Sequence, residues 1–354
     1  METGAHGRDC RRRLKNGDCL RFRILSVRLS VLERRNRLAV PIFMKKGAAI
    51  AAVLGVLLGI WGYWFYSRPY DAVRLVQCLP QDRSLHVYLN VGLLRSAGIL
   101  DLLAGSQGTE EADYKKFVEQ TGFDYRTDLD AVAAGFRDGD EYFAVQGRFK
   151  WDRLAGYAQS HQGKCDISQG SGTCSMPASQ AGKTISFSLL RRDVLALAVA
   201  RDAQASRLIF PGFWKDPPTI PTAAIWLSAP PYVFEDAKTL PAGLGPFRTQ
   251  LARARGTVFT LGPAPDQKAD QKAFEVRMTV DCNAPEDATA MAAQFSSVTE
   301  LLKKMLDRDK LKPTAGDLSG VLIAGHFEAQ KDQVTGTWPI QRKFIESLVS
   351  GKVE

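Results

Sequence analysis

The feature that most constrains this chain is an uncharged stretch of 21 residues, 47–67, with Lys45 and Lys46 before it and Arg68 after it. At the rise of an α-helix such a stretch spans about 30 Å, which is the thickness of the hydrocarbon core of a bilayer. Aromatic residues gather at its C-terminal end, where their side chains favour the membrane interface. The stretch therefore predicts a transmembrane helix over residues 47–67.

The flanks of this segment predict its orientation. Basic residues face the cytoplasm, so we expect the N-terminus inside the cell and residues 68–354 delivered across the inner (cytoplasmic) membrane. The predicted membrane-interface residues are Lys45, Lys46, Trp61, Trp64 and Tyr66. A buried core helix is one alternative. A cleaved signal peptide is the other, but large residues rather than small ones follow the apolar run, which favours an uncleaved anchor.

The net charge of +9 is confined to the N-terminal end of the chain. Residues 1–46 hold 13 basic and 4 acidic residues, whereas the other 34 basic and 34 acidic residues cancel. A neutral body gives no reason to expect a nucleic-acid-binding surface. In residues 1–43 the basic residues are ten Arg and one Lys, so we expect Met44 to be the true start and 1–43 a gene-calling extension. The functional alternatives are an arginine-rich cytoplasmic arm and an organellar transit peptide.

The body contains four cysteines, Cys78, Cys165, Cys174 and Cys282, and an even count indicates disulfides in an oxidising compartment. Cys165 and Cys174 flank a Gly-rich stretch that is typical of a hairpin loop, which predicts a disulfide between them. A bond between Cys78 and Cys282 follows only by elimination. A zinc site is disfavoured because neither Cys-x-x-Cys nor a matching His spacing is present.

Periodicity divides the body into two halves of similar element order. Strands are predicted near 85–91, 132–136, 142–149, 184–190, 194–200, 223–227, 257–261, 274–282, 321–327 and 334–338. A long amphipathic helix is predicted after Pro285, and a Pro-rich linker at 211–221. We therefore expect an α+β fold: the N-terminal transmembrane helix, then two tandem pseudo-repeats, 68–210 and 222–354, each an antiparallel sheet with helices on one face.

A short pattern runs through the first half. It reads Gly122-Phe123-Asp124, then Asp128-Leu129-Asp130, then Gly147-Arg148-Phe149. Over about residues 80–200 it resembles a pattern in uncharacterised bacterial membrane-anchored envelope proteins. The resemblance implies a single-pass envelope protein and brings no activity with it. Asp128 and Asp130 suit turn and cap positions.

Side chains that carry chemistry are scattered along the sequence. His86, His161 and His326 show no metal-ligand spacing, and neither a nucleophile elbow nor a phosphate loop is present. One acidic group consists of Asp124, Asp128, Asp130, Asp138, Asp140 and Glu141. It has the oxygen ligands that Ca²⁺ takes, but not the spacing of a calcium loop, and turn chemistry accounts for each residue. We therefore predict no catalytic, cofactor-binding or metal-binding residue and no cofactor.

These observations favour a non-catalytic, membrane-tethered, extracytoplasmic binding or assembly module. Its expected partners are the membrane and a protein or glycan of the cell envelope, with no nucleic acid. An envelope hydrolase with an unrecognised site is the alternative. A signalling protein with a genuine basic cytoplasmic tail is a third possibility.

Overall fold

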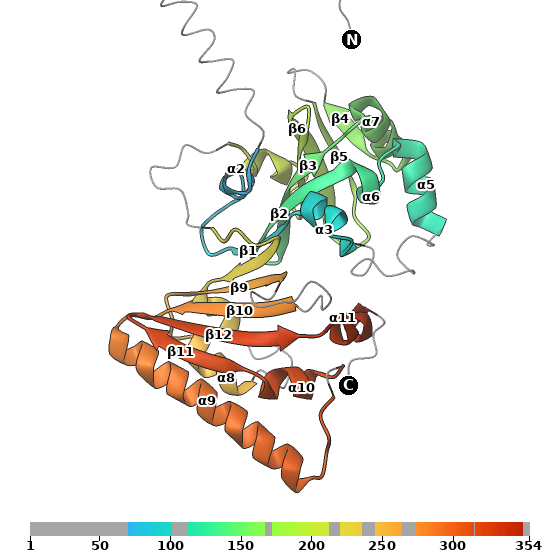
Figure 1. Cartoon of the computed structure of the whole chain (residues 1–354). Coiled ribbons are helices and arrows are strands. Elements are labelled where there is room, and N and C mark those ends of the chain that lie inside the picture. The colour runs from blue at the N-terminus through green and yellow to red at the C-terminus, as the bar shows by residue number, and fades with distance from the viewer. Residues whose placement is uncertain are drawn as a thin grey trace, which may run out of the picture. The chain divides into compact units, whose positions relative to one another are not determined.

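The computed structural model describes residues 70–100, 112–166, 172–211, 220–235, 245–263, 274–314 and 316–349 (Figure 1). All of them belong to one compact unit, Pro69–Glu354, and the other unit, Met1–Arg68, lies outside the described residues. The predicted tail (1–43), the predicted transmembrane helix (47–67) and its interface residues Lys45, Lys46, Trp61, Trp64 and Tyr66 therefore stay predictions. Within the ranges that the structure describes, no helix is both long and apolar enough to cross a membrane.

The described body is built on one antiparallel sheet of 12 strands. The strands of the first half are β1 (Leu85–Leu89), β2 (Leu129–Arg137), β3 (Asp140–Gly147), β4 (Lys164–Asp166), β5 (Thr173–Pro177), β6 (Thr184–Arg191) and β7 (Val194–Ala200). Those of the second half are β8 (Ile225–Ala229), β9 (Gly256–Pro263), β10 (Phe274–Asp281), β11 (His326–Gln330) and β12 (Gln333–Ile340). Their order across the sheet is β11-β12-β10-β9-β8-β1-β2-β3-β7-β6-β5-β4.

Helices connect the strands, and all of them except α9 are short. In the first half they are α2 (Ala72–Gln77), α3 (Val91–Ser96), α5 (Ala112–Thr121), α6 (Tyr125–Asp128), α7 (Trp151–Ser160) and the 3-10 helix η1 (Ala205–Leu208). The second half has η2 (Pro231–Phe234), α8 (Gly245–Leu251), α9 (Pro285–Arg308), α10 (Leu318–Ile323) and α11 (Arg342–Val349). Several begin at a side-chain cap: the carboxylates of Asp71 and Asp317 and the amide oxygen of Asn90 accept backbone N–H bonds of the first turn.

The expected fold was wrong in its division into two separate sheets. β1 and β8 pair antiparallel, with His86 opposite Ser228 and Leu89 opposite Ile225, so the two halves share one continuous sheet. Alone, each half would end in an edge strand whose N–H and C=O groups lack ladder partners. Pairing the two edges supplies those partners. The alternation that predicts a strand does not indicate which strand lies beside it, so this pairing was not visible in the sequence.

The expectation that helices lie on one face was also wrong. Strand β7 is apolar at every position, as a strand buried on both faces is. Val194, Ala196 and Ala198 pack in a cluster with residues of α2 and η1, whereas Leu195 and Leu197 belong to the cluster that contains α7. In the first half, therefore, helices cover both faces of the sheet, and the small alanines let α2 and η1 approach closely.

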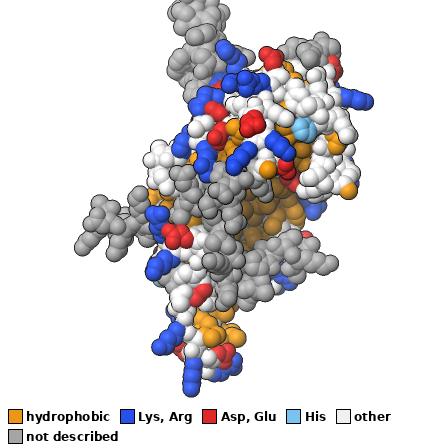
Figure 2. All heavy atoms as spheres, turned by 90° about the vertical axis from the view of Figure 1, so that its right-hand side faces the viewer, with side chains coloured by type: hydrophobic (Ala, Val, Ile, Leu, Met, Phe, Trp, Pro, Cys, Tyr) orange, Lys and Arg blue, Asp and Glu red, His pale blue; other side chains and the backbone are white. Residues whose placement is uncertain are grey.

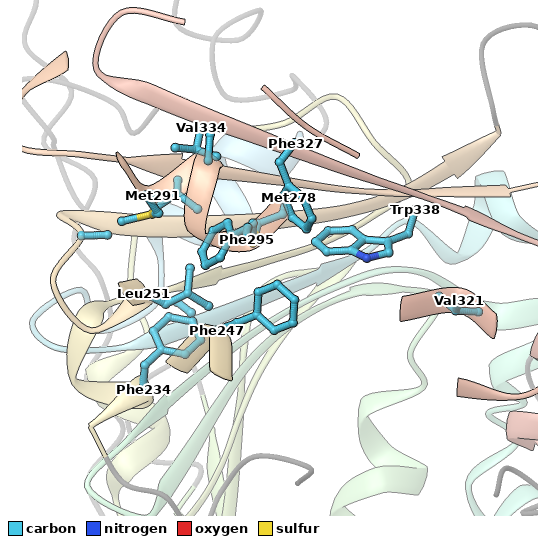
Figure 3. Close-up of a cluster of buried hydrophobic side chains, with 14 of the residues drawn as sticks. Phe234, Phe247, Leu251, Met278, Met291, Phe295, Val321, Phe327, Val334 and Trp338 are labelled. Carbon is cyan, nitrogen blue, oxygen red and sulfur yellow. The ribbon is translucent and has the colours of Figure 1, made fainter. Parts of the chain in front are cut away.

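In the second half the helices pack against a third core cluster (Figure 3). Phe295 of α9 is fully buried and its ring centroid lies 5.1 Å from that of Phe247 of α8 and 5.3 Å from that of Phe327 of β11. Trp338 of β12 meets the Phe327 ring edge-on at 5.3 Å. These aromatic contacts hold α8 and α9 on one face of β9 to β12.

Candidate functional site

An apolar cavity of about 160 Å³ lies in the first half, between helices α5 and α7 and strands β3, β5, β6 and β7. Its lining residues are Phe117, Phe123, Val145, Phe149, Leu154, Tyr157, Met176, Ile185, Phe187, Leu195 and Leu197. Every one of them presents a hydrocarbon, aromatic or thioether surface. It is partly open to solvent and is lined throughout by apolar groups, and we take it as the candidate site.

The floor of the cavity follows from strand register. Val145 of β3 stands opposite Leu195 of β7, and Leu197 of β7 stands opposite Phe187 of β6. Residues that face each other across an antiparallel ladder project from the same side of the sheet, so these four form one apolar surface. Leu154 and Tyr157, three residues apart on α7, cover it from the same helical face.

Aromatic rings close the cavity on the side of α5. The rings of Phe123 and Phe149 stack with centroids 5.2 Å apart and planes 14° apart. Phe117 of α5 meets Tyr157 edge-on at 5.2 Å and Phe123 edge-on at 6.5 Å. Helix α5 packs on α7 through these rings and stays largely exposed, with Thr121 its only buried residue. The wall on this side of the cavity is therefore a helix with one side on the aromatic rings and the other in solvent.

The predicted disulfide between Cys165 and Cys174 is confirmed. The two residues are register partners on β4 and β5, with Cα atoms 4.0 Å apart. Cys174 is fully buried in the same cluster as Leu154 and Phe187, which belong to the cavity. The bond thus joins the two strands of the last hairpin of the sheet, and its buried end packs beside residues of the cavity.

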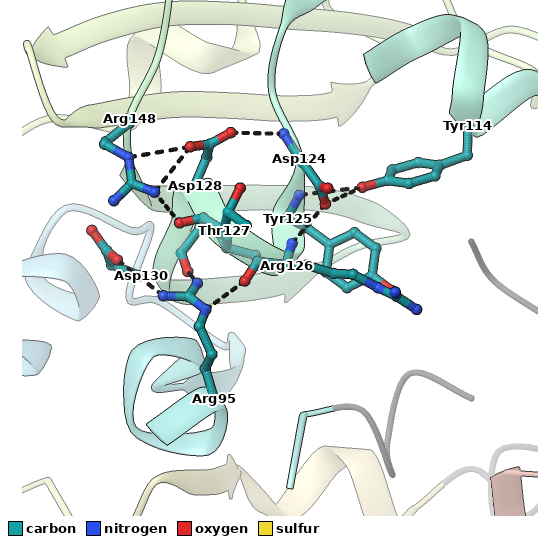
Figure 4. A network of polar contacts seen from close by, with 10 residues as sticks. Arg95, Tyr114, Asp124, Tyr125, Arg126, Thr127, Asp128, Asp130 and Arg148 are labelled. Atoms are coloured by element: carbon teal, nitrogen blue, oxygen red, sulfur yellow. Dashed lines mark hydrogen bonds and ion pairs between the residues drawn. The ribbon is translucent and has the colours of Figure 1, made fainter. Parts of the chain in front are cut away.

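A polar network joins α5 to the turn that carries Phe123 (Figure 4). The Tyr114 hydroxyl of α5 donates to Asp124 Oδ1 at 2.8 Å, and the same oxygen accepts the backbone N–H of Arg126 at 2.9 Å, which caps α6. Burial and this hydrogen bond to the carboxylate raise the pKa of Tyr114. Tyr114 is therefore a neutral donor that fastens α5 in place, not a base.

The second acid of the network, Asp128, fastens the same turn to the strand end that carries Phe149. Asp128 Oδ2 accepts the backbone N–H of Asp124 at 2.9 Å, and Asp128 Oδ1 lies 3.0 Å from Arg148 Nη2 in an ion pair. The backbone N–H of Arg148 also donates to the Asp128 carbonyl at 2.8 Å. A Cβ at Gly147 would lie 2.3 Å from that carbonyl oxygen, so glycine is required here.

The pattern quoted from the sequence thus converges on one structural unit. Its two phenylalanines, Phe123 and Phe149, stack at the cavity, while Asp124, Asp128 and Arg148 bind each other behind them. Sequence reasoning missed the cavity although it singled out these residues. The available signal was a phenylalanine in the first and in the third part of the pattern, Phe123 after a glycine and Phe149 after an arginine, which turn chemistry alone does not require.

Of the other acids of the predicted acidic group, Asp130 joins this network through Arg95, and the remaining three lie apart from it (Figure 4). Asp130 is 3.8 Å from Arg95, which also donates to the carbonyls of Arg126 and Leu129. The remaining three lie at the β2–β3 turn, where the ion-pair partners of Asp138, Asp140 and Glu141 are Arg137, Arg201 and Lys183. In the described ranges no three His, Cys, Asp or Glu side chains come close enough to hold a metal ion.

The histidines and the two other cysteines are dispersed. His86 is buried, with Nε2 3.2 Å from the Pro80 carbonyl, His161 stacks on Tyr157 at 4.1 Å, and His326 is exposed beside Glu328. The pairing of Cys78 with Cys282 that elimination suggested was wrong. Both thiols are free, and they belong to different core clusters. Burial raises the pKa of Cys78 to about 12, which leaves it unreactive.

Comparison with known proteins adds little to this picture. No family model matches the chain, and no curated protein matches it. A solved structure titled "Structure of crystal form I of TP0453" shares 11% sequence identity and a TM-score of 0.37, over 80% of this chain and 99% of that one. A likeness of this degree carries no argument about fold or activity, and the resemblance to membrane-anchored envelope proteins stays a prediction.

Proposed function

We propose that residues 69–354 form a non-catalytic binding module that holds the apolar part of a ligand in the cavity under α5 and α7. The observation that carries this proposal is the uniform lining: eleven side chains surround about 160 Å³ without one charged group. Water in such a space finds no hydrogen-bond partner in the lining, so the space favours an apolar ligand over water. A pocket of this size and lining accommodates a ring or the end of a hydrocarbon chain.

The size of the cavity limits the ligand. Pockets that enclose a whole drug-sized molecule have volumes of about 300–1,000 Å³, with a few placed polar groups that fix its orientation. This cavity is smaller and offers no such groups. We therefore infer that it takes one apolar moiety, and that the rest of a larger ligand would extend past α5.

The chemistry around the cavity supports binding rather than turnover. The acids nearest to it, Asp124 and Asp128, already accept backbone N–H groups, a tyrosine hydroxyl and an arginine. These contacts give both carboxylates a structural role, in holding the turn that carries Phe123 and the strand end that carries Phe149. An envelope hydrolase remains the alternative. It would be supported by ester or amide hydrolysis that the variant Asp128→Asn loses and the variant Asp130→Asn keeps.

The disulfide supports a location outside the cytoplasm. Such bonds persist in oxidising compartments and are rare where thiols are kept reduced. We propose that the body lies on the outer side of the inner membrane and meets an envelope partner there. Residues 47–67 as its anchor stay a prediction, which a reporter active only outside the cytoplasm, fused after Glu354, would test.

The binding proposal is tested with benzene as the probe. Benzene should raise the Tm of the unit Pro69–Glu354, because a ligand that binds only the folded state stabilises it. Val145→Phe fills the cavity and should abolish this rise with little loss of stability. The matched control is Val276→Phe, at a partly buried valine on the other core. It should cost about 1–3 kcal/mol by overpacking but keep the rise. An unchanged rise in Val145→Phe would refute the proposal.

A further inference from the structure

Helix α9 is longer than the core that it covers. It runs for 24 residues, or about 36 Å, yet its buried residues are Ala288, Met291, Ala292, Phe295 and Thr299. In Figure 1 the helix starts beside β11 and diverges from the sheet toward its C-terminal end. The last turns and the segment that follows, residues 300–312, are here called the α9 tip.

The α9 tip exposes apolar side chains. Leu301 is 58% exposed, Met305 44% and Leu311 58%, and these are three of the six exposed large hydrophobic residues in the described ranges. A groove of about 380 Å³ lies between the tip and α10, lined by Leu302, Met305, Leu306, Asp309, Leu311, Leu318, Ser319, Leu322 and Ile323. Exposed apolar side chains that gather in one place indicate an interaction surface.

Basic side chains border these apolar ones. The tip contains Lys303, Lys304, Arg308, Lys310 and Lys312 against Glu300, Asp307 and Asp309, in a chain whose residues after 46 are neutral overall. Lys304 and Arg308 each follow an exposed apolar residue, Leu301 and Met305, by three positions, so each pair lies side by side on the helix surface. Figure 2 shows hydrophobic and basic side chains meeting at the lower end of the molecule.

We propose that the α9 tip docks on an anionic phospholipid surface. Leu301, Met305 and Leu311 enter the boundary between headgroups and acyl chains, while long basic side chains extend their charges toward lipid phosphates. Two of the three acids of the tip form ion pairs within it: Glu300 lies 2.7 Å from Lys303, and Asp309 lies 2.9 Å from Arg308. Lys304, Lys310 and Lys312 outnumber the one remaining acid, Asp307, and supply the attraction to negative charge.

Charge is what favours lipid over a second copy of the chain. A self-association surface would set these lysines against one another, and like charges in contact oppose binding. An anionic bilayer instead gains about 1 kcal/mol for each Lys or Arg near its surface, which is about fivefold in affinity. The site shares no residue with the cavity under α5, so the two proposals stand or fall separately.

The test uses the full chain with Cys10→Ser and Cys19→Ser, reconstituted in vesicles, and an environment-sensitive fluorophore at Met305→Cys. Spin-labelled lipid should quench it in vesicles of phosphatidylcholine mixed with phosphatidylglycerol, and added salt should release it. The triple variant Lys304→Gln, Lys310→Gln and Lys312→Gln should shift the docking equilibrium about fivefold for each charge. A fluorophore at Glu328→Cys, an exposed site on the edge strand β11, is the matched control and should stay unquenched.

Three outcomes would overturn the proposal. The first is no quenching at position 305 in anionic vesicles. The second is equal quenching in pure phosphatidylcholine, or at position 328, because either would report proximity without charge-dependent docking. The third is a shift of the fluorescence with protein concentration in lipid-free detergent solution, which would assign the surface to a second copy. Each variant must keep its urea unfolding midpoint for the comparison to count.

Discussion

Removing the bond between Cys165 and Cys174 should destabilise the body by an amount that follows from the length of the loop. The cysteines are separated by 9 in sequence, so the bond closes a loop of ten residues. The chain-entropy relation then gives about 2.7 kcal/mol at 25 °C. The loss should reach the whole first half, because Cys174 is packed among the residues of α7 and β6.

The assay is urea unfolding of the oxidised protein, the reduced protein and Cys165→Ala. This variant breaks the bond at the less buried cysteine and leaves the Cys174 side chain in place. With an m-value of about 2–3 kcal/mol/M, the midpoint should fall by about 1 M in both reduced and substituted forms. A midpoint that moves by less than about 0.2 M would refute the entropic reasoning. A larger loss in Cys165→Ala than on reduction would show that packing, not the bond, dominates.

Two further predictions concern single side chains. Asp128→Asn should lower the free energy of unfolding by about 1–3 kcal/mol, because it weakens charge-assisted bonds to a backbone N–H and Arg148, whereas Asp130→Asn, whose pair is half exposed, should cost under 1 kcal/mol. Urea midpoints of the two variants decide this, and equal losses would contradict it. Burial lowers the pKa of His86 below its ordinary value of 6.5, so the unfolded state binds the proton more readily. The contribution of His86 to the free energy of unfolding should therefore be constant above about pH 6.5 and decline as the pH falls below it. A His86→Gln variant that kept the same decline between about pH 6.5 and 5 would contradict this assignment.

Elements with a strong period were predictable from sequence. The helix expected after Pro285 is α9, and the alternation expected near 274–282 is β10 (Phe274–Asp281). The hairpin and disulfide around Cys165 were predictable too, since Gly-rich loops between two cysteines leave few other geometries. In each case the signal lies within one segment of the chain.

The strand expected at 321–327 was wrong in its first part. The structure has helix α10 over Leu318–Ile323, and the strand begins only at His326. The apolar run Val321, Leu322 and Ile323 fits either element, and the decision comes from Asp317, whose carboxylate accepts the backbone N–H of Gly320 at 2.8 Å. An N-cap four residues before an ambiguous run was the missing signal.

The cavity could not be predicted because it belongs to no single segment. Phe117, Phe123 and Phe149 come from α5, a turn and the segment after β3, and only the pairing of β3 with β7 brings them over one floor. The union of the halves through β1 and β8 is hidden for the same reason. Both depend on which strand lies beside which, and periodicity carries no information about that.

The central pairing of β1 with β8 has a consequence for how the molecule is assembled. Outward from this pair each half follows the same order, since β1, β2, β3, β7 and β6 match β8, β9, β10, β12 and β11. His86 and Ser228, partners in the pair, lie far apart in sequence, so this seam closes only after a long loop has been ordered. Until then each half offers an open strand edge of the kind its counterpart needs. At high concentration during synthesis, β1 of one molecule can pair with β8 of another. When this pairing forms between two chains instead of within one, the product is a domain-swapped dimer.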